Sequence, residues 1–205
     1  MLKFLKYGSI ILGALLLLYP LGRAAAGDDV GVGVVKDLLT QLWDYQNGKT
    51  GAQKHVGFDI PETLVNQYIA YLIDSQTRLG VKQATIKVAS KNQVNVACGL
   101  DLRQIKAWDP SVIGEGSPLV GKDELPVNAT VSVDIANGMA KISILSASDA
   151  SGGTVGQAVI QQLFQVVASN QPEHFDLNKP IKLPFNLSVA MVDGVFYGKT
   201  PGRGR

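Results

Sequence analysis

The side chains best suited to covalent or metal chemistry in this sequence are a single cysteine, Cys98, and two histidines, His55 and His174. Cys98 shares one face of an alternating stretch with Val94 and Val96, so we expect a buried thiol. Because no basic residue is placed to lower the pKa of this thiol, we expect it to be inert. The histidines are far apart in the sequence and lack the short spacing of zinc ligands. The sequence therefore predicts neither a cysteine nucleophile nor a metal site.

Short catalytic motifs are absent from the sequence. It contains no Gly-x-Ser-x-Gly turn, no His-Glu-x-x-His motif and no phosphate-binding loop. The acidic pair Asp123-Glu124 lies beside Lys122, which is typical of a solvated turn. Hydrolysis by scattered carboxylates stays open as a third hypothesis. The sequence favours a protein that is not an enzyme, has no catalytic residues and needs no cofactor.

Residues suited to binding an apolar molecule lie in two stretches with helical periodicity. The first follows Phe58, where Asp59 and Glu62 resemble a capping box and Pro61 suits the first helical turn. At about 100° per residue its apolar side chains fill an arc of about 200°, against roughly 100° for an ordinary surface helix. These side chains are Leu64, Val65, Tyr68, Ile69, Tyr71, Leu72 and Ile73. Such a helix must be covered on two sides.

The second stretch is residues 154–169, whose apolar side chains cover about 180° of a helix. They are Val155, Val159, Ile160, Leu163, Phe164, Val166 and Val167. Glutamines form the polar face, and no charged residue occurs between Ala150 and Pro172. Because an exposed helix normally carries charge, we expect this helix also to be largely covered.

Alternation of period two predicts antiparallel strands joined as hairpins. The predicted strands are residues 84–88, 94–102, 127–135 and 139–147, followed by a last hairpin within residues 180–200. Asn137-Gly138 and Asp193-Gly194 are the turn signals. A further amphipathic helix is predicted at residues 34–46.

This order of elements predicts an α+β fold in one domain, without internal repeats. A helix that is apolar over half its surface needs more cover than a flat sheet provides. We therefore expect an antiparallel, strongly twisted sheet curled around one or two long amphipathic helices. Strands of nine or ten residues are about 30 Å long, so this arrangement leaves an elongated apolar slot between the sheet and the helices.

Residues 1–26 have the layout of a secretory signal peptide. Lys3 and Lys6 precede an apolar run from Tyr7 to Tyr19, and Ala24-Ala25-Ala26 supplies the small residues of a cleavage site. The run has 13 residues, fewer than the roughly 20 of a spanning helix. We predict export, to the periplasm in a bacterium with two membranes and otherwise out of the cell. An uncleaved membrane anchor is the alternative.

The remaining chain divides into a leader with the first helix (27–57), a main domain (58–199) and a basic tail (200–205). The signal segment carries Lys3, Lys6 and Arg23 and no acidic residue, so the mature chain is close to neutral. Its charge gives no basis for binding nucleic acid. A single cysteine excludes an intramolecular disulfide, so the core must hold the fold.

The stretches IPETLVNQYIAYLI, GVKQATIKVASKNQVNVACGLDL and LPFNLSVAMVDGVFYG resemble the tubular lipid-binding (TULIP-like) proteins, as found among small bacterial envelope proteins. The resemblance covers roughly Phe58 to Gly198 and rests on element order and apolar pattern. It implies binding of lipid or another apolar ligand in an elongated slot, or a part in envelope maintenance. One departure is that no cysteine of the lipoprotein type follows the apolar run.

We therefore expect an exported, non-catalytic protein that binds a lipid or other apolar small molecule, contacts a membrane surface, and acts in envelope lipid homeostasis or transfer. Its oligomeric state is left open. The predicted ligand-binding residues are Leu64, Tyr68, Ile69, Leu72, Val96, Val131, Val133, Ile144, Leu163, Val166 and Val167. The alternative is a cell-envelope protein with a fully packed interior, whose edge strands dock other proteins. A continuous internal slot would distinguish the first hypothesis from the second.

Overall fold

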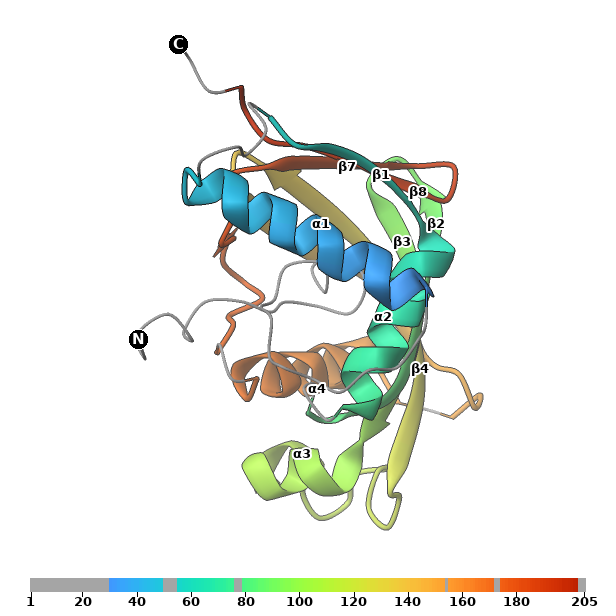
Figure 1. Cartoon of the computed structure of the whole chain (residues 1–205). Coiled ribbons are helices and arrows are strands. Elements are labelled where there is room, and N and C mark those ends of the chain that lie inside the picture. Colours follow the sequence, from blue (N-terminus) through green and yellow to red (C-terminus); the bar gives the residue numbers. More distant parts are fainter. Residues whose placement is uncertain (1–29, 50–54, 76–78, 154, 172–173, 203–205) are drawn as a thin grey trace.

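The computed structural model describes residues 30–49, 55–75, 79–153, 155–171 and 174–202, so the predicted signal peptide lies outside the described residues. The fold is α+β, as predicted, and its eight-stranded antiparallel sheet is open. The curl of this sheet around one or two long helices stays a prediction. In Figure 1 strands β1, β7 and β8 run across the top, while β2, β3 and β4 run down the right side.

The strands follow one path with a branch. The path is β1 (Gly57–Pro61), β8 (Val195–Lys199), β7 (Ser188–Val192), β4 (Glu124–Ala136), β3 (Gln93–Asp101) and β2 (Val81–Ser90). Strand β5 (Met139–Asp149) pairs with β4, and the short strand β6 (Ile181–Lys182) pairs with the start of β5. Because β4 reaches β3, β5 and β7, it joins the two parts of the sheet.

Both predicted hairpin turns are confirmed. Asn137-Gly138 joins β4 to β5 with φ angles of 51° and 74°, and Asp193-Gly194 joins β7 to β8 with φ angles of 51° and 76°. Two successive positive φ angles match the twist of the flanking strands, which explains the preference for Asn-Gly and Asp-Gly.

Three helices lie on the same side of the sheet (Figure 1): α1 (Val30–Gln46), α2 (Glu62–Asp74) and α4 (Gln157–Ser169). Helix α2 packs on β2 and on α1, whereas α4 packs on β5. The core lies between these helices and the sheet, with Ile69, Leu100 and Leu163 completely buried. Helices α1 and α4 start four residues before and three residues after their predicted first residues, Val34 and Thr154.

The capping box predicted before α2 is wrong. Pro61 is the N-cap of α2 and makes no side-chain capping bond, and Asp59 lies in β1 opposite Tyr197 of β8. The Glu62 carboxylate instead accepts a hydrogen bond from the backbone N–H of Val88, at 2.8 Å. Asp59 cannot cap α2 because the pairing of β1 with β8, from the far end of the chain, overrides the local helix-start signal.

A further helix was missed after β3. Residue Leu102, predicted as the end of a strand, begins α3 (Leu102–Trp108), which is followed by the 3₁₀ helix η2 (Pro110–Ile113). The Asp101 carboxylate accepts a hydrogen bond from the backbone N–H of Gln104 at 3.1 Å, and this cap ends the strand.

The described part of the predicted basic tail is held in place. Thr200 is buried and exchanges two hydrogen bonds of 2.9 Å with the backbone of Val56. The hydroxyl of Tyr45 on α1 donates to the carbonyl of Pro201. The folded part of the protein therefore extends beyond residue 199.

Candidate ligand-binding cavity

A cavity of about 650 Å³ lies between α4, the end of α2 and the sheet, in the volume range of roughly 300–1,000 Å³ that small-molecule sites occupy. It is bordered by α2, by the four strands β2 to β5, by α4, by Gln171 and by the segment 175–180. The lining residues are Ile69, Ile73, Val81, Ala84, Val96, Val131, Lys141, Ile142, Ser143, Ile144, Ala158, Gln161, Gln162, Phe164, Gln165, Val167, Ala168, Gln171, Phe175, Leu177, Asn178, Lys179 and Pro180.

The floor of the cavity is apolar and buried. Helix α2 contributes Ile69, strands β3 and β4 contribute Val96 and Val131, and α4 contributes Phe164 and Val167. All five side chains are buried, and the most exposed of them, Phe164, is 8 % exposed. Contact with such a surface removes apolar groups of a ligand from water, which stabilises binding by about 0.8 kcal/mol per CH₂.

The mouth of the cavity runs along an edge of the sheet. Strand β5 lines the cavity with successive residues from Lys141 to Ile144. Because alternate residues of a strand face opposite sides, successive lining residues mean that the edge of β5 itself borders the cavity. Strand β6 pairs only with Met139 and Ala140, so beyond Ala140 this edge has no strand partner among the described residues.

Pro180 explains why the edge of β5 is left open. It directly precedes β6 and lines the cavity. Proline has no backbone N–H and cannot donate to a strand ladder. The backbone N–H and C=O groups that β5 directs away from β4 are therefore available at the mouth.

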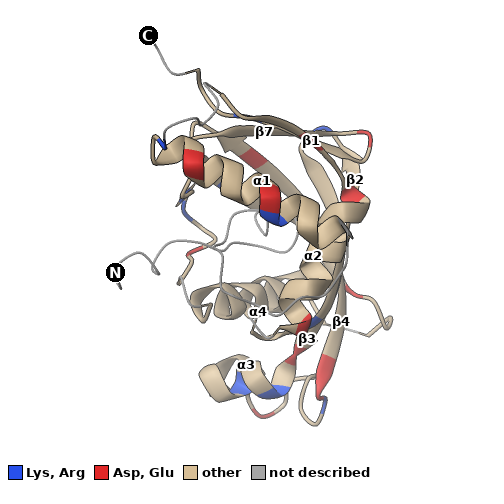
Figure 2. Cartoon of the chain, viewed as in Figure 1, with Lys and Arg blue, Asp and Glu red and all other residues tan. Residues whose placement is uncertain are grey.

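Glutamines of α4 face the edge of β5 across the mouth. Gln161, Gln162 and Gln165 all line the cavity, and α4 carries no charged residue (Figure 2). Gln165 holds the adjacent wall: its Oε1 accepts from the N–H of Leu177 at 3.0 Å, and its Nε2 donates to the Ser169 hydroxyl at 3.1 Å. The Ser169 hydroxyl donates in turn to the carbonyl of Phe175 at 3.3 Å, which fixes the segment 175–177 against α4.

The end of α4 is tied to the start of β2 by the buried side chain of Gln171. Its Oε1 accepts from the N–H of Leu79 at 3.3 Å, and its Nε2 donates to the Leu79 carbonyl at 2.9 Å. A third bond, from Nε2 to the carbonyl of Val167, measures 2.9 Å. With these bonds satisfied, Gln171 is a fixed polar part of the wall and not a free group for a ligand.

The structure brings some of the predicted ligand-binding residues to the cavity and places the others elsewhere. Those that line it are Ile69, Val96, Val131, Ile144 and Val167. Those that do not line it are Leu64, Tyr68, Leu72, Val133, Leu163 and Val166. Tyr68 is 3 % exposed and stacks on Tyr71, with ring centroids 6.0 Å apart, and Leu72, Val133 and Leu163 are also buried in the core.

The polar lining residues were missed by the sequence analysis. Gln161, Gln162 and Gln165 were seen only as the polar face of a helix, and Lys141 and Lys179 were not considered. The absence of charge on α4 was a usable signal, because a polar helix face without charge suits a wall that borders an enclosed space.

No protein-family model, curated protein or solved structure matches the chain. None of the described helices is both long and apolar enough to cross a membrane. The described residues also contain no group of three or more His, Cys, Asp or Glu side chains that could hold a metal ion.

The reactive side chains considered at the outset lie apart from the cavity. Cys98 is 5 % exposed, and burial raises the pKa of its thiol to about 12, so the inward position predicted for it is confirmed. His55 is exposed, and Nδ1 of His174 lies 2.7 Å from the carbonyl of Ser169.

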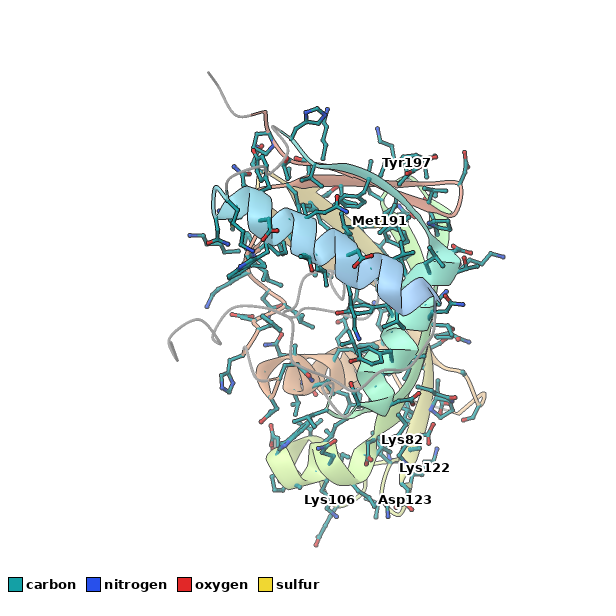
Figure 3. The ribbon with its side chains drawn as sticks, viewed as in Figure 1. Lys82, Lys106, Lys122, Asp123, Met191 and Tyr197 are labelled. Carbon is teal, nitrogen blue, oxygen red and sulfur yellow. The ribbon has the colours of Figure 1, made fainter. Side chains whose placement is uncertain are left out.

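A group of charged residues at the α3 end of the molecule is also separate from the cavity. Lys82, Lys106, Lys122 and Asp123 lie together there (Figure 3). Lys82 pairs with Glu124 at 3.4 Å and Arg103 with Asp123 at 3.5 Å. This end of the molecule therefore carries charges of both signs, and two of its basic residues are in ion pairs.

Proposed function

We propose that this chain binds a lipid or similar apolar molecule in the cavity between α4 and the sheet, without catalysis. The single observation that carries the proposal is the form of the cavity, which has a buried apolar floor and an exposed mouth lined by hydrogen-bonding groups. A site of this kind suits an amphiphile, because its chain can be buried while its polar end remains in water.

The element order and apolar pattern that resemble the TULIP-like proteins support this proposal, as does the export signal predicted at residues 1–26. On this basis we propose that the activity belongs to the cell envelope, in lipid homeostasis or transfer. N-terminal sequencing of the protein from an envelope fraction tests the export step. We expect a first residue near Gly27, whereas an intact Met1 in the membrane pellet would favour the anchor.

Native mass spectrometry of the purified chain tests the proposed binding. We expect an additional mass that disappears after extraction with organic solvent and that returns when the extracted lipid is added back. A protein that carries no adduct, and whose melting temperature does not respond to any added amphiphile, would contradict the proposal.

The open edge of β5 favours a second candidate function, which is docking of another protein by addition of a strand. In that case the cavity floor would receive a side chain of the partner. The same mass spectrometry separates the two functions, because a docking protein purifies without a small molecule and gains no stability from amphiphiles.

A further inference from the structure

We propose that the ligand is a single-chain amphiphile with a negatively charged polar end, held at the mouth between β5 and α4 with its chain directed toward α2. This inference rests on the proposed function and adds the chemistry of the ligand to it. A carboxylate and a phosphate monoester both fit the mouth, because each carries negative charge and oxygens that accept hydrogen bonds.

The charges around the cavity favour an anion. Among the described residues, the charged ones that line the cavity are Lys141 and Lys179, and none of them is an Asp or Glu. Lys179 already pairs with Asp176 at 2.9 Å. Lys141 makes no ion pair with any described residue, and Asp134, directly opposite it on β4, accepts a hydrogen bond from Asn92 at 3.3 Å. Among the described lining residues, Lys141 is therefore the cation that is left without an ion pair and can meet a ligand.

The neutral groups of the mouth add hydrogen-bond donors. The side-chain amides of Gln161 and Gln162 make no hydrogen bond to another described residue, so their N–H groups are available. The unpaired edge of β5 contributes backbone N–H groups beside them. A carboxylate or phosphate oxygen accepts hydrogen bonds only, and bonds to a charged acceptor are about twice as strong as neutral ones.

Exposure sets the orientation of the ligand. Lys141, Gln162 and Lys179 are exposed, whereas Ile69, Val96 and Val131 on the floor are buried. A ligand with its charge at the floor would leave that charge desolvated without a partner, which is strongly unfavourable. The chain therefore points inward, and a chain of about 15 Å, half the bilayer core, sets the size of a suitable probe.

Four probes with apolar chains of nearly equal length and different polar ends test the inference: dodecanoate, dodecyl phosphate, dodecanol and dodecyltrimethylammonium. Binding to the delipidated full chain is measured by calorimetry below the concentrations at which the probes aggregate. We expect the two anions to bind at least tenfold more tightly than dodecanol, and the cation to bind most weakly. The relative affinity of the two anions distinguishes a fatty acid from a phosphate monoester.

Lys141→Gln provides the matched variant, with Lys182→Gln as its control, since Lys182 is an exposed lysine of the adjacent strand that does not line the cavity. We expect Lys141→Gln to weaken binding of the anions at least threefold without changing dodecanol, and Lys182→Gln to change neither. If dodecanol binds as tightly as the anions, or Lys141→Gln weakens all probes equally, the charged polar end is refuted while the proposed function stands. If no probe binds, the charged polar end and the proposed function are both refuted.

Discussion

Asn66 of α2 and Ile86 of β2 exchange two hydrogen bonds. The side-chain amide of Asn66 donates to the carbonyl of Ile86 at 2.9 Å, and the N–H of Ile86 donates to Asn66 Oδ1 at 2.8 Å. Strand β2 ends the strand path of the sheet, so Asn66 takes the place of a neighbouring strand. Together with the hydrogen bond from the Val88 N–H to the Glu62 carboxylate, the bonds of Asn66 let α2 cover the β2 edge of the sheet. The edge of β5, by contrast, stays open at the cavity.

Replacement of Asn66 by alanine should destabilise the protein, because it leaves the N–H and carbonyl of Ile86 without their partner. We expect a loss of about 1–3 kcal/mol in the free energy of unfolding, measured by urea denaturation. Thr63→Ala is the control, since Thr63 is an exposed residue of the same helix. Equal stabilities of the two variants would show that the Asn66 bonds contribute nothing.

Replacement of Gly198 by alanine should also destabilise the protein. Phe58 lies opposite Gly198 in the β1–β8 pair, and a Cβ at Gly198 would fall 1.9 Å from the Phe58 ring. The ring must then move off the strand, at a cost of about 1–3 kcal/mol in thermal or urea unfolding. Gly57→Ala in the same strand pair is the control, because its Cβ would meet no atom closer than 4.0 Å. A Gly198→Ala variant as stable as Gly57→Ala would contradict the close packing.

The buried thiol of Cys98 should react with a thiol reagent only as fast as the protein opens. Burial raises its pKa to about 12, so very little thiolate exists at pH 8. The control places a cysteine at the exposed neighbour, as Ala97→Cys combined with Cys98→Ala. We expect this control to react at least a hundredfold faster in the native state. Equal rates would mean that the register of β3 is wrong by one residue.

Stability should also depend on Cys98 at high pH. The thiol pKa is raised by burial from 9.0 to about 12, so between these values the folded state holds a proton that the unfolded state has released. The contribution of the protonated Cys98 thiol to the free energy of unfolding is therefore complete below pH 9 and is lost as the pH rises toward 12. We expect the unfolding free energy of the parent to fall more steeply above pH 9 than that of Cys98→Ala. Parallel pH curves would contradict the raised pKa.

The parts of the fold that could be predicted are those that short patterns determine. Asn137-Gly138 specifies its turn through the positive φ angles of both residues, and the alternation around Cys98 places that side chain inward. Strand β1 could not be found in this way, because its partner β8 lies at the other end of the chain. The cap of α3 was readable, since Asp101 is followed three residues later by Gln104.

The cavity could be predicted only in part, because apolar periodicity identifies buried side chains but not the empty space between elements. Ile69 and Tyr68 are adjacent on α2 and both buried, yet only Ile69 lines the cavity. The position of the mouth depends on where β6 stops pairing with β5, which follows from Pro180 and from the packing of segment 175–177 on α4.

The central claim, that the cavity receives an apolar ligand, is tested most directly by filling it. Ala84 of β2 lines the cavity, whereas Ala140 of β5 is completely buried and does not. Uptake of a fluorescent fatty acid and thermal unfolding are measured for the parent, Ala84→Phe and Ala140→Phe. We expect Ala84→Phe to lose uptake while its melting temperature stays near that of the parent. We expect overpacking in Ala140→Phe to lower the free energy of unfolding by about 1–3 kcal/mol, while the folded variant retains uptake. Equal destabilisation of both variants, together with no uptake by the parent, would contradict the account.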